Sequence, residues 1–189
     1  ITTNEATTFS NYTLNETNNN LSNTSTTAWN ATLSSLGPEV EYSLTVYAND
    51  TSNNWGNKTI TFYVDTLEPR LENELATPST ANESQNVICS VDVNDTFTFS
   101  SVKIEENSSG TFENHTIDIT SNGSANYTIL NVEKGSYACN FYATDTAGNS
   151  NTTSTTFVVN DVTEPTIIIN SPLNQSYSTD SILLSISLN

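Results

Sequence analysis

The sequence predicts an all-β protein built from antiparallel β-sandwiches. Three observations support this prediction: segments in which apolar and polar residues alternate, turn residues between those segments, and a pattern that returns after 95 residues. Strict alternation is the period of a half-buried strand, and no segment carries the 3.6-residue period of a helix. With 189 residues, the chain can form one large domain or two of ordinary size.

The strongest evidence for the repeat is one strand that occurs twice. The segments EYSLTVYA (41–48) and SYACNFYA (136–143) both alternate, and both run into a turn rich in Asp and Asn. They align with a difference of 95, which places Leu44 opposite Cys139. A repeat of this length predicts two copies of one structural unit.

The strand that follows is also present in both copies. It reads KTITFYVDT (58–66) in the first copy and TSTTFVVND (153–161) in the second, and each copy closes on Glu-Pro. Because Pro cannot donate a hydrogen bond to a strand ladder, we interpret the two Glu-Pro steps as linkers between domains.

The strands upstream repeat less regularly. FSNYTLN (9–15) matches FSSVKIE (99–105), and LSSL (33–36) matches YTIL (127–130). The second copy also has VICSVDV at 87–93, whose only partner is ILLSISL near the end of the chain. Those two segments again differ by 95, and they align Cys89 with Leu184.

We therefore predict two units, one of which is continuous and one of which is divided between the two ends of the chain. Residues 68–163 form a complete domain, residues 1–67 form a domain that lacks its first strands, and residues 164–189 are the first strands of a following domain. About seven short strands per unit, with turns between them, indicate a sandwich of two sheets. The alternative is two ordinary domains with a tail, but a tail has no reason to supply the strands that the other end lacks.

The cysteines refine this prediction. Cys89 lies on the second strand of the complete unit and Cys139 on its penultimate strand, with Tyr137 two residues before the second Cys. This is the pattern of the inter-sheet bridge and tyrosine corner of immunoglobulin-like domains, although no Trp lies on the FSSVKIE strand to cover the bridge. We expect a disulfide here, and with it an oxidising, extracellular environment. In the split unit, Leu44 and Leu184 should fill the same place.

Composition excludes several classes of function. The net charge is −17, with only 4 Lys and Arg residues, so binding to nucleic acid or to anionic lipid is disfavoured. No apolar run is long enough to span a membrane. The only histidine, His115, lies in a polar stretch and is expected at the surface, so no catalytic triad can be assembled and we expect no enzyme activity.

The turns and linkers leave a metal alternative open. Asp50 with Asn54, and likewise Asp145 with Asn149, could contribute oxygen ligands to calcium. The linker carboxylates, Asp65 with Glu68 and Asp161 with Glu164, could do the same. None of these sets has the spacing of a dedicated calcium loop, and Asp at turns commonly bonds its own backbone. We predict no cofactor and retain calcium as the alternative.

Two long segments resemble those of a known family of proteins. They are YANDTSNNWGNKTITFYVDT and YATDTAGNSNTTSTTFVVND, and each is followed by Glu-Pro. They resemble the tandem Ig-like repeats of large prokaryotic surface proteins, and the Asn- and Thr-rich composition is most similar to archaeal cell-surface and filament glycoproteins. The resemblance implies an extracellular structural or adhesive role, and it implies no chemistry.

Glycosylation motifs support an extracellular location independently. Fifteen Asn-x-Ser/Thr sequons occur, more than the abundance of Ser and Thr alone would place. Glycans would also mask the exposed strand edges of a sandwich. The expected glycosylation sites are Asn11, Asn15, Asn20, Asn23, Asn30, Asn49, Asn57, Asn82, Asn94, Asn107, Asn114, Asn122, Asn126, Asn151 and Asn174.

The split unit predicts how copies join. We expect the C-terminal strands of one copy to complete the N-terminal domain of the next, either by strand donation between subunits or within a longer tandem chain. The protein would then be a unit of an extracellular filament or cell-surface stalk, with further copies of itself and N-linked glycans as partners. The alternative geometry is a hairpin that folds back onto the N-terminal domain of its own chain. The alternative function is an adhesin or carbohydrate-binding module, in which Trp29, Trp55 and Tyr12 form a platform for sugars. The residues expected at the junction are Phe9, Leu44, Tyr47, Ile182, Leu184 and Ile186.

Overall fold

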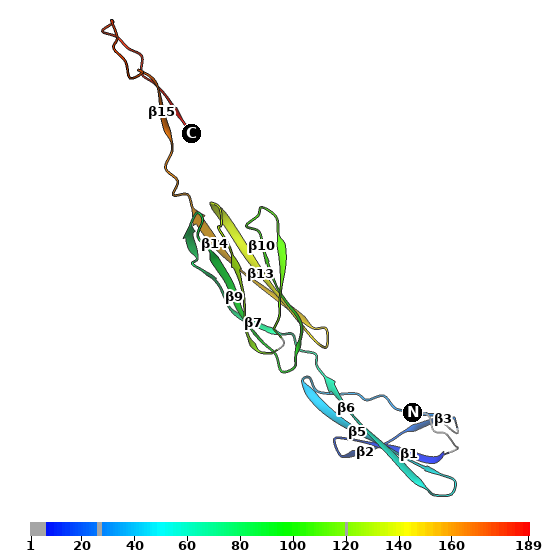
Figure 1. Cartoon of the computed structure of the whole chain (residues 1–189). Helices are drawn as coiled ribbons and strands as arrows, with labels where there is room; N and C mark the ends of the chain where they lie inside the picture. Colours follow the sequence, from blue (N-terminus) through cyan, green and yellow to red (C-terminus); the bar gives the residue numbers. More distant parts are fainter. Residues whose placement is uncertain (1–6, 26–27, 120) are drawn as a thin grey trace.

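The computed structural model describes residues 7–25, 28–119 and 121–189, and the regular structure in them is entirely β. Three bodies follow one another along an extended molecule (Figure 1): an N-terminal sheet, a complete sandwich and a C-terminal hairpin. The all-β prediction is therefore confirmed. The part of the chain that is described contains no helix able to cross a membrane.

The central body is a sandwich of two antiparallel sheets. The five-stranded sheet has the order β11-β10-β13-β14-β8 and the three-stranded sheet the order β12-β9-β7, with only the short β8 pairing in parallel. This is an Ig-like arrangement, because the second and penultimate long strands, β9 and β13, lie in opposite sheets. The strands are β7 (Arg70–Thr77), β8 (Thr80–Asn82), β9 (Val87–Asn94), β10 (Phe99–Glu106), β11 (Glu113–Ile117), β12 (Gly123–Ile129), β13 (Gly135–Asp145) and β14 (Ser150–Asn160).

Alternate residues of these strands fill the space between the sheets, as the alternating pattern predicts. Val87, Val91 and Val93 on β9 face Phe141 on β13, and all of these side chains are buried. The sulfurs of Cys89 and Cys139 are bonded across the two sheets, with their Cα atoms 6.3 Å apart. The core is thus continuous and covalently bridged.

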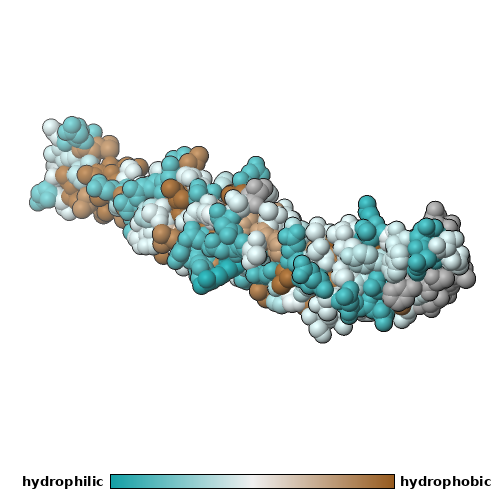
Figure 2. Space-filling view, turned by 90° about the horizontal axis from the view of Figure 1, so that it is seen from below, coloured by the Kyte–Doolittle hydropathy of each residue, from teal (hydrophilic) through white to brown (hydrophobic). Residues whose placement is uncertain are grey.

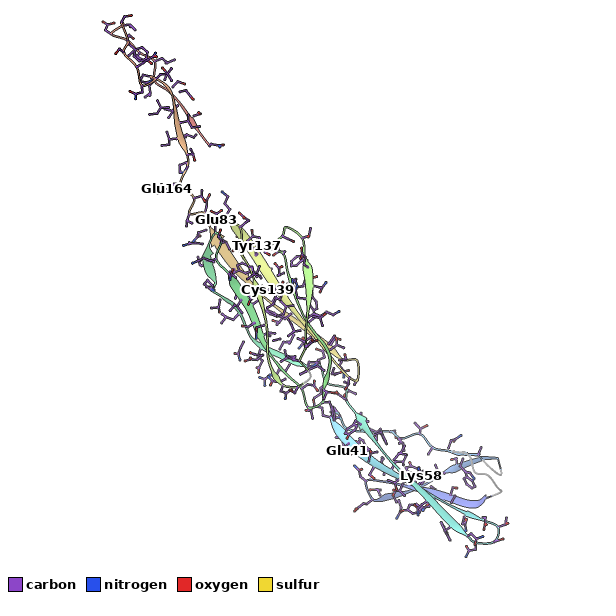
Figure 3. All side chains as sticks on the ribbon, in the orientation of Figure 1. Glu41, Lys58, Glu83, Tyr137, Cys139 and Glu164 are labelled. Atoms are coloured by element: carbon purple, nitrogen blue, oxygen red, sulfur yellow. A yellow bond between two sulfur atoms is a disulfide. The ribbon has the colours of Figure 1, made fainter. Side chains whose placement is uncertain are left out.

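The tyrosine corner lies next to the bridge (Figure 3). The Tyr137 hydroxyl donates to the carbonyl oxygens of Glu133 and Lys134, 3.1 Å from each. Gly135 makes room for that ring, because a Cβ at this position would lie 2.7 Å from the hydroxyl oxygen. The ring also packs against Phe157, with 5.4 Å between the ring centroids.

The N-terminal body is a single four-stranded sheet with the order β2-β1-β5-β6, beside the short hairpin β3–β4. Its order matches β11-β10-β13-β14 of the sandwich, strand for strand, but among the described residues no equivalent of the three-stranded sheet β12-β9-β7 lies against it. The strands are β1 (Thr7–Leu14), β2 (Thr17–Asn20), β3 (Ser22–Ser25), β4 (Ala28–Asn30), β5 (Val40–Asp50) and β6 (Trp55–Val64).

Local details confirm that the two bodies are copies of one design. Tyr42 stacks on Phe62 with ring centroids 5.5 Å apart, as Tyr137 packs on Phe157. The Tyr42 hydroxyl also closes its own corner, by accepting a hydrogen bond from the Gly37 amide.

Two sequence-based expectations need correction. The β1 strand pairs Leu14 with Leu44, and β10 pairs Glu106 with Cys139, so β1 and β10 match with a difference of 92. The sequence alignment of FSNYTLN with FSSVKIE is therefore two residues out, an error that the period of 2 conceals because it leaves every side chain on the same face. The LSSL segment (33–36) also forms no strand. Its counterpart in the sandwich, β12, pairs with β9, and no equivalent of β9 lies beside LSSL among the described residues.

Candidate functional site: an uncovered sheet and an exposed hairpin

The C-terminal body is a two-stranded hairpin of β15 (Ile167–Ser171) and β16 (Ser185–Leu188). Its pairing repeats that of β7 with β9. Ile167 lies opposite Leu188 as Leu71 lies opposite Val93, and both ladders carry an irregularity a few residues further along. The hairpin thus repeats the pairing of β7 with β9 in the sandwich.

The apolar side chains of this hairpin are exposed to solvent. In the complete sandwich, Val87, Cys89, Val91 and Val93 are at most 1% exposed. The residues that align with them on the hairpin range from 42% to 67% exposure, and Figure 2 shows hydrophobic atoms gathered at that end of the molecule. These residues are Ile182, Leu184, Ile186 and Leu188.

The N-terminal sheet also exposes apolar side chains. The face that corresponds to the core side of the sandwich holds an apolar groove of about 380 Å³. Leu44 and Val46 line it from β5, and they align with the buried Cys139 and Phe141. Ile60 on β6 lies beside them and is 52% exposed, although it belongs to the core side of the sheet.

The predicted junction residues divide between the two faces of this sheet. Leu44 lines the groove, whereas Tyr47 aligns with the outward-facing Tyr142 and lies on the opposite face. The side chain of Phe9 lies outside the described residues. Val46 and Ile60 were missed in the sequence; their alternation with Leu44 along paired strands was the available signal.

The aromatic residues considered as a sugar platform do not lie together. Tyr12 and Trp29 are 8% and 9% exposed and form part of the floor of the groove. Trp55 is 58% exposed and is not among the residues that line the groove. Two of the three aromatic residues therefore belong to packing in the N-terminal body.

Most sequon asparagines lie on the surface. Ten of the fifteen are exposed: Asn15, Asn20, Asn30, Asn57, Asn82, Asn94, Asn114, Asn122, Asn126 and Asn174. Asn11, Asn49, Asn107 and Asn151 are half-buried, and the side chain of Asn23 lies outside the described residues. Asn151 also donates its amide to the Pro69 carbonyl oxygen at 2.9 Å, which holds the nitrogen that a glycan would need.

The acidic turns are occupied by their own hydrogen bonds. The Asp145 carboxylate accepts bonds from the Asn149 side chain and from the Gly148 and Asn149 amides. Asp50 repeats the arrangement with Asn54, at 2.7 Å between Asn54 Nδ2 and Asp50 Oδ2. Both Asp side chains thus bond the backbone of their own turns, as the sequence predicts for Asp at these positions.

The linker carboxylates Asp161 and Asp65 differ in their hydrogen-bond partners and in the direction of their pKa shifts. Asp161 is paired with Lys134, 2.6 Å from Oδ2 to Nζ, and this hydrogen bond lowers the pKa of Asp161. Among the described residues, Asp65 accepts the Leu67 amide on Oδ1, and its buried Oδ2 has no hydrogen-bond partner. Burial raises the pKa of Asp65, and nearby Asp145 and Asp95 raise it further.

Comparison with known proteins identifies no relative by sequence. No family model matches the chain, and no curated protein matches it. Among solved structures, the chain is similar to fibronectin(III)-like modules of Clostridium thermocellum CbhA, at 13% identity over 85% of this chain and 82% of that one, with a TM-score of 0.41. At this level of similarity, the assignment of the fold depends on the chain's own strands and their pairing.

Proposed function

We propose that this chain is a structural unit of a glycosylated extracellular filament or cell-surface stalk. In this proposal, the C-terminal hairpin of one copy completes the N-terminal sheet of the next copy. The observation that carries the proposal is the match between the two exposed surfaces. One body has strands equivalent to β10, β11, β13 and β14, and the hairpin supplies the equivalents of β7 and β9.

Burial of the exposed side chains supplies the driving force. Each Ile or Leu that moves from water into a sandwich core contributes about 1.5–3 kcal/mol. Ile182, Leu184 and Ile186 would enter the groove from one copy and meet Leu44 and Ile60 of the next. Extended strands would also give the unpaired segment around 33–36 a partner, as β9 is the partner of β12 in the complete sandwich.

The geometry favours association between copies over closure within one chain. The hairpin and the N-terminal sheet lie at opposite ends of the molecule, with the complete sandwich between them (Figure 1). The contact joins two different surfaces, so it repeats head to tail and generates an open thread instead of a closed dimer. The same geometry serves separate subunits and repeats within one longer polypeptide.

The surface chemistry is consistent with an extracellular location. The disulfide is stable in an oxidising compartment, and the exposed sequons offer sites for a glycan coat. Strand edges such as that of β11 would be protected by such a coat, since a free edge is a template for aggregation. The role that we propose is mechanical, with no catalytic step.

Binding of a carbohydrate is the second candidate. It would use the same groove, in which Trp29 and Tyr12 lie beside Lys58. Saturable binding of an oligosaccharide by the chain, with loss of binding on Trp29→Ala, would favour this function over assembly.

The test of assembly uses the purified chain and a peptide that spans residues 164–189. We expect the chain to form threads in electron micrographs, with a sedimentation coefficient that rises with concentration. Excess peptide should fill the grooves and cap the threads, whereas the peptide with Leu184→Asp should not. A chain that stays monomeric at every concentration and binds no peptide would refute the proposal.

A further inference from the structure

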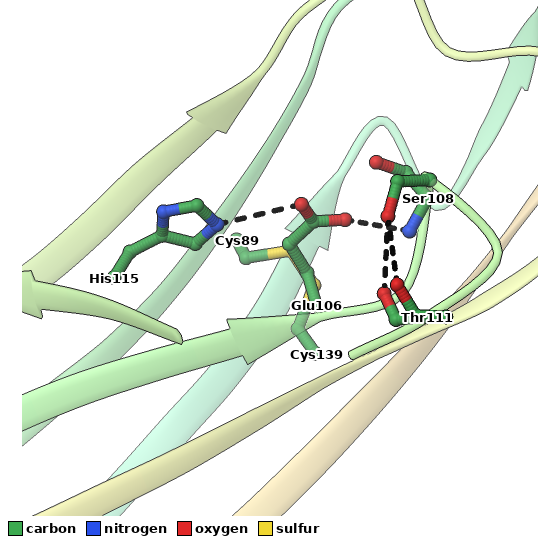
Figure 4. Close-up of polar contacts among 7 residues, drawn as sticks. Cys89, Glu106, Ser108, Thr111, His115 and Cys139 are labelled. Carbon is green, nitrogen blue, oxygen red and sulfur yellow. Dashed lines mark hydrogen bonds and ion pairs between the residues drawn. A yellow bond between two sulfur atoms is a disulfide. The ribbon is translucent and has the colours of Figure 1, made fainter. Parts of the chain in front are cut away.

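Three side chains with metal-binding groups meet at one edge of the complete sandwich. Glu113 and His115 are two residues apart on β11, so they share one face of the strand. Glu106 lies directly opposite Glu113 on β10. One carboxylate oxygen of each Glu and one imidazole nitrogen all lie within 4.8 Å of one another. Figure 4 shows Glu106 and His115 directed toward each other beside the disulfide.

The distance between two of these groups suits metal ligands better than a hydrogen bond. His115 Nε2 lies 3.4 Å from Glu106 Oε1, whereas a good hydrogen bond of this type measures about 2.9 Å. Two ligands of a tetrahedral ion with bonds of about 2.05 Å lie roughly 3.4 Å apart. The His115–Glu106 pair therefore has the spacing of one edge of a coordination tetrahedron.

The charges at this edge also favour a cation. Glu106 is only 4% exposed, and a second carboxylate, Glu113, lies directly across the strand pair. Two like charges in opposite positions are destabilising, and the ion-pair partner of Glu106 is His115, which carries a charge only when it is protonated. Glu106 Oε2 accepts the Ser108 amide at 2.7 Å, which leaves Oε1 facing His115. Among the described residues, no Lys or Arg forms an ion pair with Glu106.

The imidazole is held in place by its neighbour. The His115 ring stacks on Tyr127 with the ring centroids 3.7 Å apart and an angle of 12° between the planes. The side chain of His115 is 20% exposed, so it is half-buried in the edge of the sandwich and not a surface residue as the sequence suggested. Stacking limits rotation of the ring and keeps Nε2 directed toward Glu106.

The N-terminal body shows that the fold does not require these three residues. Leu14 pairs with Thr17 there as Glu106 pairs with Glu113, and Tyr12 pairs with Asn19 as Ile104 pairs with His115. The same two-strand edge thus forms with Leu14, Thr17 and Asn19 in the three positions. A purely structural explanation does not account for a buried carboxylate at this edge of one copy alone.

We propose that Glu106, Glu113 and His115 form a zinc-binding site that clamps the edge strand β11 to β10. One imidazole nitrogen and two carboxylate oxygens suit Zn²⁺ and leave a fourth position for water. Ca²⁺ and Mg²⁺ prefer coordination by oxygen alone. The site goes beyond the proposed assembly and does not depend on it.

The test is direct because His115 is the only histidine in the chain. Zinc chloride is titrated into the full chain while calorimetry measures the stoichiometry and ¹⁵N spectra follow the imidazole. We expect one Zn²⁺ per chain, a displaced imidazole signal, and no competition by Ca²⁺. Glu113→Gln, at an exposed position, should weaken binding by at least about 10-fold, a change of about 1.4 kcal/mol.

The control variant is Glu133→Gln, which removes an exposed carboxylate from a turn and should bind zinc like the parent chain. A rise in unfolding temperature with zinc in the parent chain, absent in Glu113→Gln, would support the clamp. Absence of saturable binding, an imidazole signal that zinc does not move, or equal affinity in the Glu113→Gln variant would overturn the proposal.

Discussion

The N-terminal body and the central sandwich use the same strands in the same order, yet only one of them encloses a core. On β13, Phe141 and Cys139 are fully buried, whereas Val46 and Leu44 occupy the same positions on β5 and stay half-buried. The difference lies in what covers them. In the sandwich β12, β9 and β7 form the second sheet, and no equivalent of that sheet covers the N-terminal body among the residues that the structure describes.

A sheet whose apolar residues all lie on one face does not by itself enclose a hydrophobic core. Its corner, its turn and its strand order all form without the opposite sheet, because hydrogen bonds and local contacts determine them. Burial of the apolar face requires a second sheet over it. The exposed hairpin at the other end of the chain has the pairing and the side chains that this face lacks.

The largest effect should come from charging the hairpin. The double change Leu184→Asp and Ile186→Asp would place two carboxylates in the core of the completed domain, where burial of an unpaired charge is very costly. We expect association between copies to weaken by more than about 100-fold, or about 2.7 kcal/mol, measured by sedimentation equilibrium.

The matched control for that experiment is Leu183→Asp. Leu183 is 77% exposed and aligns with Ile88, which stays 42% exposed in the complete sandwich. Its side chain would remain on the outer face after assembly, so association should be unchanged. Equal loss of association in both variants would indicate a general effect of charge and would contradict completion of the sandwich.

Removal of the disulfide should lower the stability of the sandwich and leave that of the N-terminal body unchanged. The double change Cys89→Ala and Cys139→Ala removes a link between residues 50 apart and should destabilise the sandwich by roughly 2–5 kcal/mol. The bridge lies outside the N-terminal body, so capture of the 164–189 peptide should be unaffected. Denaturant unfolding, followed by tryptophan fluorescence for the N-terminal body and by the ¹⁵N–¹H amide signals of β9 and β13 for the sandwich, measures both effects.

Both tryptophans, Trp29 and Trp55, lie in the N-terminal body, which makes that separation possible. If the tryptophan signal and the sandwich amide signals shifted equally on loss of the disulfide, the two bodies would unfold as one unit. The comparison drawn between them would then not hold.

The tyrosine corners should contribute less, and about equally. Tyr137→Phe removes hydrogen bonds to two carbonyl oxygens, and Tyr42→Phe leaves the Gly37 amide without its acceptor. A hydrogen bond of this kind contributes about 0.5–1.5 kcal/mol net. We expect each variant to lower the stability of its own body only, in the same unfolding experiment. A larger loss in the opposite body would show that the corners are not equivalent.

The smallest effect concerns pH. Burial would raise the pKa of Asp145, but the hydrogen bonds from Asn149 and Gly148 outweigh it and hold the pKa below its ordinary value of 3.8. A carboxylate with a lowered pKa stabilises the fold above its unfolded pKa, and this contribution is lost as pH falls through the folded value. The sandwich should therefore lose stability below about pH 4, and Asp145→Asn should flatten that dependence. Urea midpoints measured across this range check it; identical slopes in the two proteins would contradict the assignment.

Much of this architecture could be predicted from the sequence because alternation and a fixed repeat distance are local signals. They identified β5 with β13 and β6 with β14, and they aligned Leu184 with Cys89. The register of β1 was missed because a shift of two residues preserves alternation. The cluster around His115 was missed because it depends on the pairing of β10 with β11, and nothing in the spacing of Glu106 and Glu113 reveals that pairing.

The groove was only partly predictable for a related reason. Leu44 was found through its alignment with Cys139, but Ile60 and Trp29 enter the groove from other strands. Their contribution depends on which strands lie side by side, and that is a property of the sheet. Tyr47 was assigned to the groove although its position in the alternation places it on the other face.

The most direct test of completion between copies uses the bridge of the sandwich as a template. Leu44 and Leu184 align with Cys139 and Cys89, whose Cα atoms lie 6.3 Å apart. The variant with Leu44→Cys and Leu184→Cys, oxidised under mild conditions, should therefore form disulfides between molecules and run as a ladder of multimers on a non-reducing gel. A chain that closes the new disulfide within one molecule, or that leaves both new thiols free, would contradict head-to-tail completion.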